Sequence, residues 1–201
     1  MIGRPAPTAK KQVPCLVFAL ALGGTAAVAA AAATPSPVID NDRVTVWDVT
    51  TTLPPAAHDF LALSYPGKGS VTVGHPGETP GHADQHTVVI ELKNAAVTPL
   101  ANASGYPNAF PRPRVEKVLE TDKLIVWRYR WNPGEITPMH FHDKDVVVVY
   151  GEDTVLESTT PDGKSTVNSY KAGEIRFNKR DRVHSERLMN GAGSAMITEL
   201  K

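Results

Sequence analysis

Two histidines separated by one residue are the side chains of this sequence best suited to metal chemistry. His140 and His142 lie within 134–151, GEITPMHFHDKDVVVVYG, directly before a run of valines. Residues two apart in a β-strand point to the same face, so both imidazoles would lie on one side of a strand and Phe141 on the other. Paired imidazoles can bind one transition-metal ion, but a lone H-x-H is more often an ordinary surface pair. The elements around the pair decide between these two interpretations.

Strand signals dominate the chain after its first forty residues, and helix signals are nearly absent. The candidate strands are rich in β-branched and aromatic residues and are separated by Pro-Gly, Pro-Asp-Gly and Ala-Gly turns. They are 43–49, 86–92, 123–131, 145–150, 154–158, 165–170, 174–178 and 195–200. This spacing predicts an all-β sandwich or barrel. The proline-containing stretch 99–114 has no periodicity and indicates an extended connection strapped over the barrel.

The first 33 residues have the pattern of an export signal. Arg4, Lys10 and Lys11 precede an apolar run, VPCLVFALALGGTAAVAAAAA, that ends in small residues. We expect a signal peptidase to cleave near Ala33, which predicts a periplasmic or secreted protein with no membrane association after cleavage. Cleavage would also remove the single cysteine, Cys15, so the mature chain would form no disulfide. The alternative is a transmembrane anchor, because the run is about long enough to span a bilayer, although its alanine-rich half is weakly hydrophobic.

The two halves of the chain resemble each other. RVTVWDV at 43–49 parallels KLIVWRY at 123–129, and HTVVIELK at 86–93 parallels GSAMITELK at 193–201. The first half is about 28 residues shorter between these segments, which corresponds to roughly three strands and their turns. This pattern predicts an internal repeat with a truncated first copy, and chance similarity between β-rich segments is the alternative. If the repeat is real, the second copy carries any chemistry.

A third histidine completes the pattern on which a family resemblance rests. Gly134, His140 and His142 match in register the first motif of the cupin superfamily, G-x5-H-x-H. Gly173 and His184 match the glycine and the histidine of its second motif, G-x5-P-x-G-x2-H. Two partial motifs at the right separation, on a chain with all-β patterning, make the sequence similar to this superfamily.

The resemblance covers residues 123–201 well and 43–93 faintly, as a truncated copy in a two-cupin chain. It implies an all-β fold of the cupin type, a double-stranded β-helix that forms a jelly-roll-like barrel with a truncated N-terminal cupin-like half. The expected organisation is a signal peptide at 1–33, the truncated half and its connecting strap at 34–114, and the cupin barrel at 115–201. In particular, the chain resembles exported bacterial cupin-domain proteins.

The departures from the motifs concern the metal ligands. The glutamate ligand of the family falls at 146–147, where this chain has two valines. Asp145 is one position early, and strand alternation would point it away from the histidines. Three candidate metal ligands therefore carry over without a carboxylate: His140, His142 and His184. Imidazoles suit Zn, Fe, Ni and Cu, whereas a carboxylate would favour Mn or Fe. A barrel that has lost a ligand can also be a metal-free binding pocket.

The leading expectation for function is an exported, metal-dependent enzyme that acts on a small organic molecule. The basic run KRDR at 179–182 precedes His184 and would suit an acidic substrate at the barrel mouth, although charged turns are usually only solvated. The alternatives are a metal-free module that binds a small molecule and a structural barrel that forms a homodimer. A formal net charge of zero, with no basic block, argues against a nucleic-acid partner. Neither the reaction nor the catalytic residues follow from the fold.

Overall fold

The computed structural model describes residues 3, 35–64, 69–81, 86–93, 97 and 100–201. Within these ranges the chain forms fourteen β-strands and no helix. Accordingly, this part of the chain contains no helix with the length and apolar character needed to cross a membrane. The predicted signal peptide, 1–33, lies outside the described residues except for Gly3. The all-β fold expected from the strand and turn pattern is confirmed.

The strands form three antiparallel sheets, which we name A, B and C. Sheet A has the order β1-β2-β5-β3-β4, with β1 at Ile39–Asp40, β2 at Val44–Val49, β3 at Phe60–Ser64, β4 at Val71–Gly74 and β5 at Thr87–Leu92. Sheet B has the order β11-β10-β13-β8, with β8 at Ile136–His142, β10 at Thr154–Thr159, β11 at Ser165–Tyr170 and β13 at Arg182–Gly191. Sheet C has the order β12-β9-β14-β7-β6, with β6 at Val115–Glu120, β7 at Leu124–Trp131, β9 at Asp145–Tyr150, β12 at Ile175–Asn178 and β14 at Gly193–Leu200.

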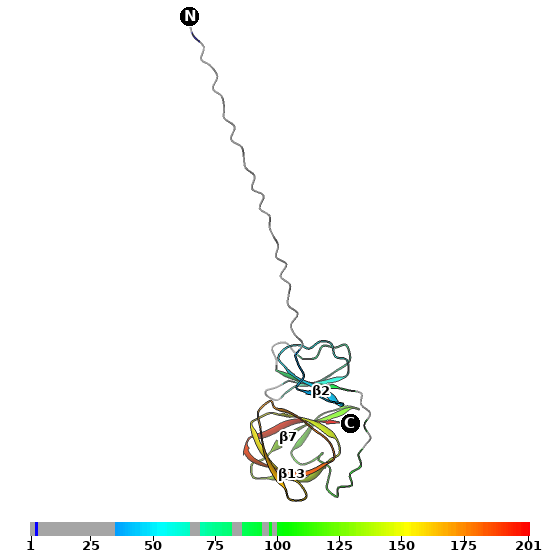
Figure 1. The fold of residues 1–201 in the computed structure, drawn as a ribbon, viewed down its shortest axis with the longest axis vertical. Helices are drawn as coiled ribbons and strands as arrows, with labels where there is room; N and C mark the ends of the chain where they lie inside the picture. Colours follow the sequence, from blue (N-terminus) through cyan, green and yellow to red (C-terminus); the bar gives the residue numbers. More distant parts are fainter. Residues whose placement is uncertain (1–2, 4–34, 65–68, 82–85, 94–96, 98–99) are drawn as a thin grey trace. The chain divides into compact units, whose positions relative to one another are not determined.

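Sheets B and C face each other, and the chain passes back and forth between them (Figure 1). Strands β7, β8, β9 and β10 fall alternately in C and B, and so do β12, β13 and β14. The inner faces share one core, to which sheet C contributes Trp127 and Tyr129 and sheet B contributes Leu156 and Leu188. Successive strands that alternate between two facing sheets form the predicted double-stranded β-helix. We refer to sheets B and C together as the barrel.

The valine run forms strand β9, which is buried on both faces. Val147 and Val149 pack into a core shared with sheet A, whereas Val146 and Val148 belong to the core of the barrel. Strand residues alternate between faces, so a strand covered on both sides requires apolar residues at consecutive positions. Sheet C is therefore the layer common to both cores, which explains why no polar residue interrupts the run.

Sheet A repeats the strand order of sheet C. The order β1-β2-β5-β3-β4 corresponds to β6-β7-β14-β9-β12. The registers agree as well, because Trp47 pairs with Val89 and Trp127 pairs with Ile197, each partner lying two residues before a Glu-Leu-Lys ending. The four strands of sheet B have no counterpart among the described residues of the first half. The truncated copy thus retains one sheet and lacks the equivalent of four strands rather than the expected three.

The segment 107–112, which we call the strap, runs along the outer edge of sheet B. Strand β8 is the edge strand, and its Phe141 donates a backbone hydrogen bond to the carbonyl of Pro107 (2.8 Å) and accepts one from the amide of Ala109 (2.7 Å). Asn108 forms a parallel bridge with the same residue. The extended connection predicted from the prolines is therefore held to the barrel by an isolated bridge and two backbone hydrogen bonds.

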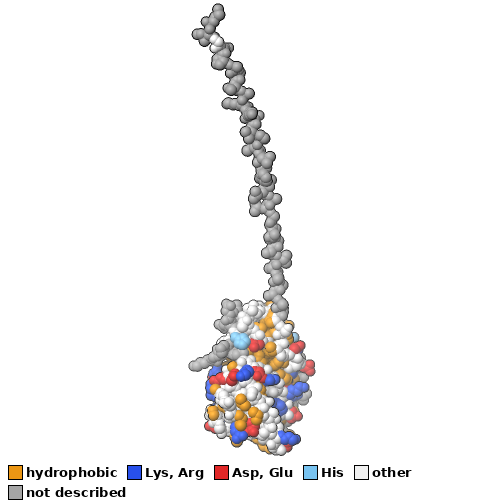
Figure 2. Space-filling model, turned by 60° about the vertical axis from the view of Figure 1, so that its left-hand side comes forward, with side chains coloured by type: hydrophobic (Ala, Val, Ile, Leu, Met, Phe, Trp, Pro, Cys, Tyr) orange, Lys and Arg blue, Asp and Glu red, His pale blue; other side chains and the backbone are white. Residues whose placement is uncertain are grey.

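Charged side chains of both signs lie among one another on the molecular face in Figure 2. Exposed ion pairs such as Arg128 with Glu116 and Arg187 with Glu157, each at 2.7 Å, join neighbouring strands of the barrel. Exposed pairs of this kind contribute at most about 1 kcal/mol each. The stability of the fold therefore rests mainly on its buried hydrophobic clusters.

Candidate metal centre

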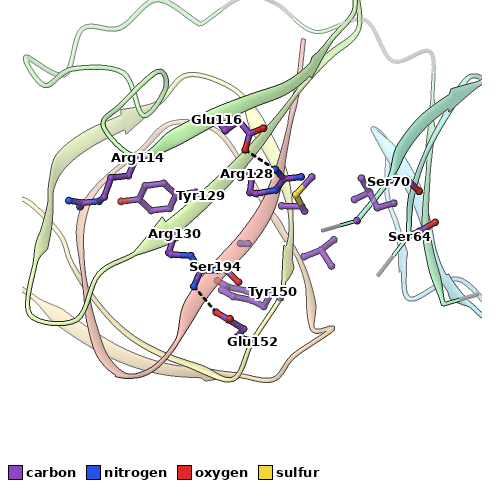
Figure 3. A pocket seen from close by; sticks show the side chains of 16 residues that line it. Ser64, Ser70, Arg114, Glu116, Arg128, Tyr129, Arg130, Tyr150, Glu152 and Ser194 are labelled. Atoms are coloured by element: carbon purple, nitrogen blue, oxygen red, sulfur yellow. Dashed lines mark hydrogen bonds and ion pairs between the residues drawn. The ribbon is translucent and has the colours of Figure 1, made fainter. Parts of the chain in front are cut away.

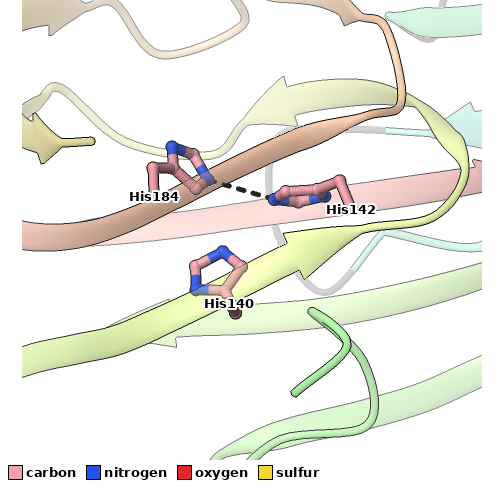
Figure 4. A group of neighbouring side chains, drawn as sticks. All are labelled: His140, His142 and His184. Carbon is pink, nitrogen blue, oxygen red and sulfur yellow. Dashed lines mark hydrogen bonds between the residues drawn. The ribbon is translucent and has the colours of Figure 1, made fainter. Parts of the chain in front are cut away.

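The three predicted histidines meet inside the barrel (Figure 4). His140 and His142 lie on β8, and His184 lies opposite His140 on the neighbouring strand β13. One ring nitrogen from each histidine lies within 4.8 Å of the others, and the Nε2 atoms of His142 and His184 are 3.0 Å apart. The alternation of β8 and its pairing with β13 are sufficient to produce this convergence.

Hydrogen bonds to the outer ring nitrogens fix the orientation of two of the imidazoles. His140 donates from Nδ1 to the carbonyl of Pro138 (2.7 Å), because that oxygen can only accept. His184 Nδ1 lies 2.9 Å from the hydroxyl of Ser158. A partner on Nδ1 is the usual device that turns Nε2 of a ligand histidine toward a metal. His142 Nδ1 is buried without a hydrogen-bond partner among the described residues.

Burial keeps the three imidazoles neutral. It lowers the pKa of His140 to about 4, and the charge of Arg112 acts in the same direction. It lowers the pKa of His142 far below the usual value, with Arg182 as the next contributor. Burial also lowers the pKa of His184, against a smaller opposing effect of Glu186. Neutral imidazoles are the form that binds metal, so protons do not compete at neutral pH.

The group of converging ligand atoms consists of the three histidines alone, as expected, but a carboxylate lies beside it. Glu186 follows His184 by two residues, its side chain is 14% exposed, and its Oε1 is 4.0 Å from His184 Nε2. Its Oε2 accepts a hydrogen bond from Trp131 Nε1 (3.0 Å). Burial by itself would raise the pKa of Glu186, but the neighbouring His184 and Arg112 bring it below the usual value. The spacing H-S-E on one strand was the sequence signal that could have identified this residue.

Asp145, the acid nearest the first motif in sequence, points away from the histidines as strand alternation predicts. Its Oδ2 lies 3.1 Å from Arg43 Nη1, and its Oδ1 accepts a hydrogen bond from the backbone amide of Arg180 (2.8 Å). The carboxylate therefore ties β9 to the first half of the chain. It takes no part in the histidine cluster.

An arginine from the strap reaches into the histidine cluster. Arg112 Nη1 lies 3.0 Å from Nε2 of His140, and Nη2 lies 3.6 Å from Oε2 of Glu186. The guanidinium stacks over the ring of Tyr129 at 4.0 Å and over Phe110 at 4.8 Å. Its side chain is only 10% exposed. Nothing in the local sequence Pro-Arg-Pro-Arg distinguishes this inward arginine from its outward neighbour, so sequence reasoning missed it.

The cavity beside the histidines has a volume of about 30 Å³. His142, His184, Glu186, Arg112 and Arg182 are among the residues that line it. A space of this size holds a single ion or water molecule but no organic molecule. The donor set and the space both fit one transition-metal ion: three buried neutral imidazoles converge, and a carboxylate lies beside them.

A larger cavity of about 620 Å³ lies elsewhere, against strand β3 and sheet C (Figure 3). Three arginines line it, but each has an acidic partner: Arg114 pairs with Glu135, Arg128 with Glu116 at 2.7 Å, and Arg130 with Glu152 at 3.5 Å. None of its described lining residues is a histidine. Paired charges and the lack of a metal-binding or nucleophilic cluster make this larger cavity a poorer candidate for chemistry than the histidine site.

Comparisons with known proteins find similar solved structures, whereas no family model and no curated protein matches. A cupin domain from Bordetella pertussis is 23% identical, with a TM-score of 0.41 over 48% of this chain and 96% of that chain. A cupin 2 conserved barrel domain protein from Leptotrichia buccalis is 13% identical, with a TM-score of 0.44 over 82% of this chain and 87% of that chain. A protein from Klebsiella pneumoniae with a double-stranded β-helix domain is 20% identical, with a TM-score of 0.35 over 50% of this chain and 82% of that chain.

These likenesses are distant, so the fold is assigned from the strands and motifs of the chain itself. Gly134 and Gly173, the first residues of the two motifs, both have positive φ (76° and 84°), a conformation that favours glycine. The histidines of the two motifs lie on adjacent strands of a sheet that faces another across one core. All-β topology, alternating strands and both motifs agree. The chain has a cupin fold.

Proposed function

We propose that the protein binds one transition-metal ion through His140, His142 and His184 and acts on a small anionic organic molecule. The convergence of three buried imidazoles within 4.8 Å is the observation that supports this proposal. When bound, the metal would polarise a coordinated oxygen or lower the pKa of a coordinated water. Imidazole ligands suit Zn, Fe, Ni and Cu, and the adjacent Glu186 adds an oxygen donor of the kind that favours Mn or Fe.

Two arginines at the histidine cavity support an anionic substrate. Arg112 and Arg182 both line this cavity, and Glu186 is the one acid among its described lining residues. The lining of the cavity therefore has one more basic than acidic side chain, which would attract and orient a carboxylate or a similar group. Because the cavity measures only about 30 Å³, an organic molecule needs the guanidinium of Arg112 to move aside. Arg112 would thus both recognise the substrate and restrict its entry.

Metal binding by the purified protein tests this proposal. We expect chelator-treated protein to take up one equivalent of Zn²⁺, Ni²⁺, Fe²⁺ or Mn²⁺, measured by calorimetric titration and by elemental analysis after desalting. The site contains one cluster of three converging imidazoles, so the stoichiometry should be one ion per chain. A chain that takes up none of these ions would contradict the proposal and favour a metal-free binding module.

We further propose that the protein is exported and that the first 33 residues are removed. The basic start, the apolar run and the alanine-rich end of this segment support the proposal. Intact mass of the protein from the periplasm or medium should show the loss of about 33 residues. Leu20→Arg, which interrupts the apolar run, should leave the full-length chain unprocessed. Full-length wild-type chain in the membrane fraction would indicate an anchor instead.

A further inference from the structure

We propose that Arg112 is an internal cation that competes with the metal for the histidine site, so that metal binding requires its guanidinium to leave. This inference rests on the proposed metal function and adds a residue that sets the affinity of the site. Arg112 lies on the strap, and residues of both barrel sheets contact its side chain. The site is therefore closed by the chain itself rather than by a separate partner.

The first support is that Arg112 places a positive charge beside the ring nitrogen that a metal needs. His140 Nδ1 is committed to the carbonyl of Pro138, so Nε2 carries the lone pair. Arg112 Nη1 lies 3.0 Å from Nε2 and 3.5 Å from Nδ1 of the same ring, so the guanidinium lies against the imidazole. A metal ion bound at Nε2 would meet this charge at short range and be repelled by it. Arg112 and a metal ion therefore compete at His140.

The second support is charge. Glu186 is buried, and the guanidinium of Arg112 lies 3.6 Å from its Oε2. A buried carboxylate requires a nearby positive charge, which either Arg112 or a divalent ion supplies. Arg112 and a divalent ion would therefore neutralise the same carboxylate. If Arg112 stayed in place, its charge and that of Arg182 would both repel the ion. Replacement of Arg112 by a divalent ion keeps a positive charge beside Glu186.

The third support is that Arg112 is held incompletely. Its Nε is buried without a hydrogen-bond partner among the described residues. Arginines with a purely structural role normally satisfy their buried donors, because each unsatisfied one costs free energy. The stacking on Tyr129 and Phe110 anchors the side chain without using its donors. This arrangement favours a side chain that leaves when a better cation arrives.

A calorimetric titration of chelator-treated protein with Zn²⁺ tests the proposal. Arg112→Met keeps the length of the side chain and removes the charge and the donors. We expect this variant to bind Zn²⁺ about ten- to a hundredfold more tightly than the wild type, because a positive charge beside the ligand nitrogens no longer opposes the ion. Arg114→Met is the matched control: Arg114 lies two residues after Arg112, is 37% exposed and pairs with Glu135. Its affinity should equal that of the wild type.

The outcomes separate the two proposals. If Arg112→Met binds Zn²⁺ as tightly as the wild type, or more weakly, Arg112 does not compete and this inference is wrong while the metal site stands. If neither the wild type nor Arg112→Met binds Zn²⁺, the proposed metal function fails, and the competition fails with it. Tighter binding by both arginine variants would indicate a general effect of charge and would also overturn the inference.

A second measurement uses the wild-type protein and does not depend on the folding of a variant. An arginine-selective dicarbonyl reagent, followed by peptide mass mapping, reports which guanidinium groups are accessible. Arg112 should be protected in metal-free protein and should become reactive when one equivalent of Zn²⁺ is bound, whereas the exposed Arg114 should react in both states. Arg112 that stays protected with Zn²⁺ fully bound would show that it need not leave.

Discussion

His142→Ala is expected to weaken the binding of transition metals by more than about a hundredfold. Mutation of a residue that only orients a metal ligand typically lowers metal affinity about ten- to a hundredfold, and loss of a ligand itself should lower it further. His142 is buried on β8, and its Nε2 faces that of His184 at 3.0 Å. Two remaining imidazoles would hold the ion with open positions and little geometric constraint. Calorimetric titration of the chelator-treated variant with Zn²⁺ and Ni²⁺ measures the loss.

His75→Ala is the matched control for this prediction. His75 is 69% exposed and pairs with Asp59 at 3.0 Å, outside the barrel interior. Its replacement should leave metal affinity unchanged. Metal content in a His140/His142/His184 triple-alanine variant equal to that of the wild type would exclude the proposed site. The far-ultraviolet circular dichroism of each variant should retain the strand signal, which distinguishes a lost ligand from a lost fold.

The stability of metal-free protein should fall steeply as the pH drops below about 6.5, the usual pKa of histidine. The pKa of His140 is about 4 in the folded state, and those of His142 and His184 are also lowered. Between the unfolded and folded values the unfolded chain binds a proton that the folded chain rejects, so stability decreases as pH falls. Each histidine contributes up to about 1.4 kcal/mol per pH unit in this window. Urea denaturation at several pH values measures the slope.

His140→Gln isolates the contribution of one histidine. Glutamine keeps a polar group of similar size and does not titrate. The number of protons taken up on unfolding between about pH 6.5 and 4, which sets the slope of stability against pH, should therefore decrease by about one. Glu199, whose pKa is raised chiefly by burial, does not depend on His140 and cancels in the comparison, whereas the pKa of Glu186 is lowered in part by His140 and changes with it. An unchanged slope would mean that His140 is not buried in its neutral form.

The same lowered pKa values extend the range of metal binding. Imidazoles with ordinary pKa values would lose metal as the pH falls through about 6.5. Because burial lowers the pKa of His140 to about 4, proton competition at this ligand begins at a lower pH. Metal affinity should therefore be nearly constant between pH 7 and pH 5.

Local patterning predicted the elements that depend on short-range order. The alternation of β8 placed His140 and His142 on one face, and the valine run predicted a buried strand that the structure locates between two cores. Strands β1, β3, β4, β6 and β13 were not predicted. Each of them is held by pairing with a neighbouring strand, as β3 is by β5, β6 by β7 and β13 by β10, which is a tertiary effect.

The parts of the site that sequence reasoning missed come from long-range packing. Glu186 could have been found from its alternation with His184, since both lie on β13. Arg112 could not, because its entry into the barrel depends on the pairing of the strap with Phe141 and on the stacking surface of Tyr129. Neither contact has a signature within the segment 107–112.

The strap also governs which parts of the molecule are open to strand addition from another chain. The amide and carbonyl of Phe141 would otherwise form an unpaired edge, a surface on which extended chains assemble into larger sheets. Pro107 and Ala109 occupy both groups, so the edge of sheet B is covered at this point of β8. Full detachment of the strap would expose this backbone to a neighbouring molecule. Resistance to aggregation therefore favours a movement in which the Arg112 side chain leaves while the strap backbone stays in place.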